Sequence, residues 1–237
     1  MSIACRVLAS VRNAHEAALV WPWVDLVDAK QPAEGALGAL DAATLRDIVR
    51  TVAGRRPVSA TVGDLPLQAA LLAPAMQAVA DTGVDFVKVG LFGSADVPRL
   101  TTCLRDLPTL HAAPGRPAPP ARIAVLMADQ GGVHWPLHLL AEAGFAGVML
   151  DTADKHCGGL LAVLDLDALR HFVEQARALG LLSGLAGSLA VQDIPTLLPC
   201  QPDYLGFRTA LCTGGVRTEA VDAAQVAAVT AVVRQAR

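Results

Sequence analysis

The chain has 237 residues, of which 53% are apolar and 17% charged, and its formal net charge is −3. This composition supplies enough apolar surface for a sizeable core and excludes an intrinsically disordered chain. The charge balance, the scattered arginines and a total of nine aromatic residues argue against a nucleic-acid-binding surface.

The amino-terminal stretch MSIACRVLASVRN predicts a first strand rather than a secretory leader, because Arg6 and Arg12 interrupt any apolar run. The longest uncharged run, residues 65–80, is shorter than the ~18 residues that suggest a membrane span, and prolines break it. Five cysteines without a CxxC spacing indicate reduced thiols. We therefore expect a cytoplasmic protein without a membrane partner.

Short β-branched or apolar runs alternate with Ala/Leu-rich segments of helical length along the whole chain. In chain order, the pattern predicts strand 3–11, helix 14–20, strand 24–29, helix 43–53, strand 58–62, helix 67–82, strand 86–91, helix 95–107, strand 123–127, helix 136–143, strand 147–150, helix 166–179, strand 182–186, helix 191–197, strand 204–207 and helix 221–237.

Eight strand–helix units in a chain close to ~250 residues favour a closed (β/α)8 TIM barrel over an open doubly wound sheet. The Pro/Gly-rich stretch at residues 111–122 resembles a linker, but neither half of the chain alone has enough strands for a parallel sheet. The sequence thus predicts a single barrel domain over residues 1–237. In this fold, chemistry collects where strands end, so the polar residues there are the candidates for a site.

The sequence has three lysines and sixteen arginines, and each lysine maps to the C-terminal part of a predicted strand or to the loop directly after it. Lys30 follows the second strand, Lys88 lies in the fourth, and Lys155 follows the sixth. Arginine-biased composition explains why lysines are few but not where they are placed. A lysine can lose its proton and act as an amine nucleophile, whereas a guanidinium stays charged. We interpret all three as candidate catalytic residues.

Two carboxylates accompany these lysines. Asp28 and Lys30 are two residues apart, so on a strand both side chains point to the same side. Asp151 ends the sixth strand. Asp28 and Asp151 are predicted to hold the ammonium groups and to move protons. A capping role is the alternative for Asp151.

The seventh and eighth strands are each followed by a glycine-containing loop, GLAGSL and GFRTALCTGG. In barrels these two loops commonly form a phosphate site with backbone N–H groups at a helix N-terminus. Gly187, Ser188 and Gly206 are the candidate backbone contacts, and Arg208 is the candidate charged fork. The alternative is that the glycines serve only tight packing and turns.

A metal site is not favoured. His134 and His138 have i,i+4 spacing, but Pro136 lies between them and no third ligand has suitable spacing. Capping or packing roles are the preferred interpretation of these histidines, and of the DKHC stretch at residues 154–157. We expect no metal.

The stretches VDLVDAKQPAEGALGA, PVSATVGDLP, FVKVGLFG, GVMLDTADK and GLAGSL together resemble the (5-formylfuran-3-yl)methyl phosphate synthase family of methanofuran biosynthesis. The resemblance runs from the first strand through at least Cys212 and covers most of the chain.

The resemblance implies a TIM-barrel lyase that condenses two molecules of glyceraldehyde 3-phosphate without metal or organic cofactor. One phosphate is eliminated, and the ring closes with loss of water. Lys30 then matches the Schiff-base lysine, and Asp28, Lys88, Asp151 and Lys155 match the other catalytic positions. The residues alone leave the choice between Lys30 and Lys88 open. The Ala/Arg-rich composition suggests a bacterial relative that serves one-carbon metabolism.

Two alternatives remain at this point: a phosphosugar decarboxylase-type barrel that uses an Asp/Lys array without an imine, and a non-catalytic phospholigand-binding barrel. The expected partner is a triose phosphate, and the apolar composition makes a homo-oligomer an additional expectation.

Overall fold

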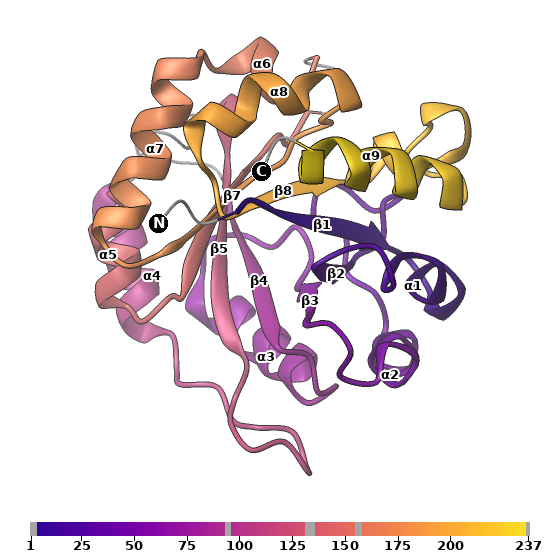
Figure 1. Cartoon of the computed structure of the whole chain (residues 1–237). Coiled ribbons are helices and arrows are strands. Elements are labelled where there is room, and N and C mark those ends of the chain that lie inside the picture. The colour runs from indigo at the N-terminus through magenta and orange to yellow at the C-terminus, as the bar shows by residue number, and fades with distance from the viewer. Residues whose placement is uncertain (1–3, 93–95, 131–135, 155–157, 236–237) are drawn as a thin grey trace.

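The computed structural model describes residues 4–92, 96–130, 136–154 and 158–235. Within these residues, eight parallel strands close into a barrel in which each strand pairs with its neighbours in the chain and β8 pairs with β1. Helices surround the strands (Figure 1). The prediction of a (β/α)8 barrel is confirmed.

The strands are β1 (Arg6–Val11), β2 (Leu26–Ala29), β3 (Val58–Thr61), β4 (Phe86–Leu91), β5 (Ala121–Met127), β6 (Gly147–Asp151), β7 (Leu182–Leu185) and β8 (Tyr204–Phe207). The α-helices are α1 (Ala14–Val20), α2 (Ala42–Val52), α3 (Ala69–Ala80), α4 (Val97–Asp106), α5 (Leu137–Glu142), α6 (Leu160–Val163), α7 (Leu166–Ala178), α8 (Ile194–Leu197) and α9 (Ala223–Gln235).

Each predicted element corresponds to an observed one, and most ends differ by only a few residues. The predicted helix 191–197 differs most. It consists of a 3-10 turn, η3 (Val191–Asp193), and the single turn of α8, which begins with a proline near its first position. The Pro/Gly-rich segment extends away from the barrel between α4 and β5 (Figure 1), and β5, which follows it, pairs directly with β4.

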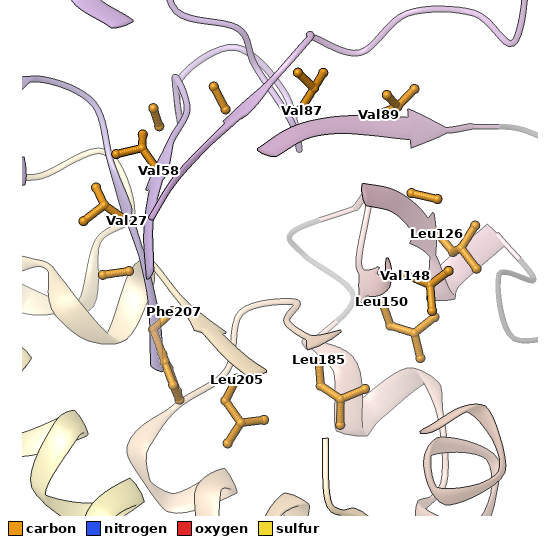
Figure 2. Packing of buried hydrophobic residues seen from close by; sticks show 14 of the residues in the cluster. Val27, Val58, Val87, Val89, Leu126, Val148, Leu150, Leu185, Leu205 and Phe207 are labelled. Carbon is orange, nitrogen blue, oxygen red and sulfur yellow. The ribbon is translucent and has the colours of Figure 1, made fainter. Parts of the chain in front are cut away.

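The strands are apolar on their outer side, where they pack against the helices. Figure 2 shows this outer layer, which includes Val27, Val87, Leu150 and Phe207. A second, smaller cluster fills the inside of the barrel and includes Leu8 and Met149. Because successive side chains of a strand point to opposite sides, strands such as β1 and β6 contribute to both layers. The polar side chains described below occupy the inward positions left between the apolar ones.

Three aspartates fasten neighbouring strands at the amino-terminal end of the barrel. Each stands just before an even-numbered strand and accepts a hydrogen bond from a backbone N–H of the strand before it. Asp25 accepts from Val7 (2.9 Å), Asp85 from Val58 (2.8 Å) and Asp203 from Ser183 (2.8 Å). These carboxylates satisfy donors at strand ends, where the parallel ladder runs out.

Replacing Asp203 tests this arrangement, because its carboxylate also accepts from the Ser183 hydroxyl at 3.0 Å. Asp203→Ala leaves both donors without this acceptor, and we expect the free energy of unfolding to fall by about 1–3 kcal/mol in urea titrations. Asp167→Ala is the control, since that side chain is 89% exposed and forms a surface ion pair with Arg170 that is worth less than about 1 kcal/mol. Equal stability losses in the two variants would contradict the interpretation.

Candidate functional site

Four charged side chains of the predicted catalytic set line one cavity at the carboxyl ends of the strands: Asp28, Lys30, Lys88 and Asp151. Strand alternation explains their inward direction, with Asp28 and Lys30 on the same side of the chain as predicted. Lys88 lies deeper in the barrel than predicted, because it is not in the C-terminal part of its strand. It is the third residue of the six in β4, so its ammonium group reaches the site from below the rim.

Asp28 is the most enclosed of these groups and has no exposed surface. Its carboxylate accepts hydrogen bonds from the hydroxyls of Ser10 (3.0 Å) and Ser59 (2.6 Å) and from the Lys88 ammonium (3.0 Å). Burial acts to raise the pKa of Asp28, but the charges of Lys88 and Lys30 and the Ser59 hydrogen bond outweigh it and hold that pKa below its usual value. Asp28 is therefore an ionised carboxylate at neutral pH.

Lys30 and Asp151 form a second, looser pair. The Lys30 Nζ lies 3.9 Å from Asp151 Oδ2, which is ion-pair range but longer than a direct hydrogen bond. The other carboxylate oxygen, Oδ1, accepts a hydrogen bond from the Thr152 backbone N–H at 2.8 Å. Asp151 thus combines the capping role and the ion-pair role that the sequence left as alternatives.

Lys155, the third predicted lysine, lies outside the described residues. The loop that leads to it is held by Asp129, which follows β5. The Asp129 carboxylate accepts from the backbone N–H groups of Ala153 (2.9 Å) and Asp154 (2.7 Å). Sequence reasoning missed Asp129; its position directly after a strand was the available signal.

Asp64, after β3, holds the loop after β2 in the same way. Its carboxylate accepts from the N–H groups of Ala36 (2.9 Å) and Leu37 (2.8 Å), and the Leu37 side chain is fully buried. The Thr61 hydroxyl donates to the Gly38 carbonyl at 2.9 Å. Residues 35–38, which follow Lys30 closely in the chain, therefore pack onto the barrel mouth in this structure.

The predicted backbone contacts for phosphate line the same cavity: Gly187, Ser188 and Gly206. Gly187 and Ser188 both have positive φ, +103° and +51°, a conformation that costs energy for the serine. Their N–H groups have no hydrogen-bond acceptor within the described parts of the chain. At Gly206, a Cβ would lie 2.6 Å from the Met149 Cε, so a larger residue would displace that side chain. Because the following helix is so short, these N–H groups act without a substantial helix dipole.

Arg208 lines the cavity, but its guanidinium is used within the protein. Nε donates to the Arg217 carbonyl, Nη1 to the Ser10 carbonyl and to Glu16, and Nη2 to Glu16 and to the Glu219 carbonyl. All five N–H donors of the side chain thus have protein acceptors. Arg208 therefore supports the rim and has no fork left for a phosphate, contrary to the role expected for it.

His138 lies on α5, whereas His134 and residues 155–157 fall outside the described segments. Among the residues that are described, no group of three or more His, Cys, Asp or Glu side chains is arranged to hold a metal ion. The described helices also include none that is both long and apolar enough to cross a membrane.

The sequence matches the 4-HFC-P synthase family over residues 7–230. It is 41% identical over 223 residues to a putative (5-formylfuran-3-yl)methyl phosphate synthase from Methylorubrum extorquens, covering 94% of this chain and 89% of that protein. A (5-formylfuran-3-yl)methyl phosphate synthase from Methanosarcina acetivorans is 33% identical over 220 residues, covering 90% and 93% of the two chains.

Among solved structures, 3-hexulose-6-phosphate synthase from Salmonella typhimurium superposes with a TM-score of 0.65, covering 98% of this chain and all of that one. At 17% identity this likeness concerns the fold alone. The family match and the identity to the two relatives extend along nearly the whole barrel. The chain belongs to the 4-HFC-P synthase family, the (5-formylfuran-3-yl)methyl phosphate synthases.

Proposed function

We propose that this protein forms (5-formylfuran-3-yl)methyl phosphate from two molecules of glyceraldehyde 3-phosphate through an imine on Lys30. The observation that carries the proposal is the pair of amine–carboxylate couples in one cavity, Lys30 with Asp151 and Lys88 with Asp28. Such an arrangement offers an amine nucleophile and several groups that transfer protons. The names of the relatives supply the product.

The geometry favours Lys30 over Lys88 as the nucleophile. Lys88 donates a 3.0 Å hydrogen bond to a fully buried carboxylate, and its amine becomes available only if that pair breaks. Breaking a buried ion pair is costly because each charge is left without its partner. Lys30 stands directly after the end of β2, closer to the mouth of the barrel, and its Nζ lies 3.9 Å from Asp151 Oδ2, longer than a direct hydrogen bond.

The first half of the reaction takes place on this imine. The Lys30 nitrogen adds to the aldehyde carbon of one triose phosphate, and water leaves. The positive iminium makes the neighbouring C–H acidic, and a carboxylate removes that proton. The electron pair then expels the phosphate from the next carbon. Asp151, beside Lys30, is the candidate base for this step.

The second half joins the two trioses. The enol left by the elimination gains a proton at the carbon that carried the phosphate and becomes a ketone. Loss of a proton from the resulting methyl group makes that carbon nucleophilic, and it adds to a carbonyl carbon of the second triose phosphate. Ring closure and dehydration follow, and hydrolysis of the imine releases Lys30. Overall, two triose phosphates give the furan phosphate, one inorganic phosphate and two waters, so no oxidant or reductant is needed. Asp28 and Lys88 are placed to transfer protons in these steps, and the N–H groups of Gly187 and Ser188 to hold the phosphate that stays on the product.

Borohydride trapping tests the proposal. Incubation with glyceraldehyde 3-phosphate and borohydride should attach a reduced triose to Lys30, located by peptide mass spectrometry, and without borohydride a furan-aldehyde absorbance should appear. Lys30→Arg keeps the charge beside Asp151 but cannot form an imine, so it should give no adduct and lower kcat by at least about 10³-fold.

Lys88→Arg is the matched variant, and it should keep the adduct on Lys30 while turnover falls. An adduct on Lys88 would overturn the assignment of the nucleophile. Turnover of another phosphosugar by an enzyme that forms no adduct would favour a decarboxylase-type barrel, and triose phosphate binding without any turnover would favour a binding protein.

The pH dependence of kcat/KM tests the role of Asp28. Its hydrogen bond from Ser59 helps to lower the pKa of that carboxyl, so Ser59→Ala should raise the pKa and move the acid limb of the profile to higher pH. Since the Asp28 carboxylate itself remains in Ser59→Ala, the plateau value of kcat/KM should fall by no more than about tenfold.

Ser183→Ala removes a strand hydroxyl bonded to Asp203 at the opposite end of the barrel and should leave the acid limb unchanged. If the limb in Ser59→Ala stays in place or moves to lower pH, the ionisation of Asp28 does not govern it.

A further inference from the structure

Four cationic side chains line the cavity within the described part of the chain: Lys30, Lys88, Arg208 and Arg217. Three of them have a carboxylate within ion-pair range: Asp151, Asp28 and Glu16, respectively. Arg217 has no carboxylate partner within 4.0 Å among the residues that the structure describes. The cavity therefore carries one guanidinium that forms no ion pair with the described side chains; the carboxylates of Asp151 and Asp64 act on it only from a longer distance.

The backbone around Arg217 is fixed from within the barrel. Arg208 donates to the carbonyls of Arg217 and Glu219, each at 2.8 Å. Arg208 is in turn held by Glu16, whose side chain is 2% exposed. A buried ion pair thus holds this stretch of chain against the end of β8.

The side chain of Arg217 is directed by a contact with the loop after β2. Its Nη2 donates to the Gly35 carbonyl at 3.0 Å, and the Asp64 carboxylate holds the next two residues of that loop. The remaining N–H groups of the guanidinium have no acceptor within the described segments. A half-buried guanidinium therefore lies at the cavity. Its contact with Gly35 holds it in place, and its remaining N–H groups are available to a ligand.

We propose that Arg217 binds the phosphate group of the triose attached to Lys30, the phosphate that is eliminated. This inference rests on the proposed function. The reaction brings two phosphomonoester dianions into one cavity, and the backbone contacts at Gly187 and Ser188 account for one of them. The planar guanidinium suits the other, since it pairs with phosphate oxygens through parallel hydrogen bonds.

The position of Arg217 indicates which of the two triose phosphates it binds, namely the one joined to Lys30. Its guanidinium contacts Gly35, five residues after Lys30 on the loop that leaves β2. A phosphate held there belongs to the substrate whose aldehyde is joined to Lys30. When the C–O bond breaks, the leaving phosphate keeps the electron pair, and a fixed cation stabilises that developing charge.

Calorimetric titration with inorganic phosphate tests the site without relying on the imine. Arg217→Gln should weaken phosphate binding by about 10- to 100-fold, as expected for loss of a charge-assisted contact. Arg217→Lys should restore part of the affinity, because it returns the charge without the fork. Arg105→Gln, which removes an exposed arginine of α4, is the control and should bind phosphate like the unaltered protein. Phosphate affinity unchanged in Arg217→Gln, with an unaltered melting temperature, would overturn the proposal.

The borohydride adduct then identifies which substrate Arg217 serves. In Arg217→Gln, the triose phosphate concentration that half-saturates adduct formation on Lys30 should rise by about 10- to 100-fold, and phosphate release in a single turnover should slow. An adduct formed at the original concentration, with a raised KM only for furan formation, would assign Arg217 to the second triose and contradict the proposal. Absence of the adduct from the unaltered protein would refute the imine chemistry itself, which is a separate result from the phosphate titration.

Discussion

A carboxylate without solvent contact, inside a closed barrel, is the constraint on which the site depends. Asp28 stands on β2 and receives donors from β1, β3 and β4 through Ser10, Ser59 and Lys88. An ionised carboxylate is stable in such a place only when its oxygens are well bonded and a counter-charge is near. The four strands therefore have to be in register for the charge to be tolerated, and once they are, the Lys88 ammonium has a fixed position.

The same requirement extends around the mouth of the barrel. Glu16 and Arg208 form a second buried pair, which joins α1 to the end of β8 and holds residues beyond it. Asp64 and Asp129 each bind two consecutive N–H groups of a neighbouring loop. These carboxylates place loop backbone around the cavity by direct hydrogen bonds, so the mouth is shaped by contacts between adjacent strand–loop units.

The fold and most of the charged site could be predicted because they depend on local pattern. Alternation along strands and the strand–helix rhythm indicated the barrel, and the two-residue spacing placed Asp28 and Lys30 on one side. The role of Arg208 could not be predicted, since its partner Glu16 lies 192 residues away in the sequence. Arg217 was missed for a related reason. Its place at the cavity depends on hydrogen bonds with Arg208, nine residues away, and with Gly35, 182 residues away, and strand or helix periodicity predicts neither contact. The helix after β7 was predicted too long because its apolar spacing continues across a proline.

The aspartates that fasten β1 to β2, β3 to β4 and β7 to β8 lie at the amino-terminal end of the barrel, and Lys30 and Lys88 line the cavity at the other end. Between the two ends lies a layer of apolar side chains that includes Leu8, Leu26 and Met149. This layer separates the two sets of charges, which share no hydrogen bond among those described. The contacts that fasten the sheet and the contacts that place the site are thus separate hydrogen-bond networks, and a substitution in one leaves the hydrogen bonds of the other in place.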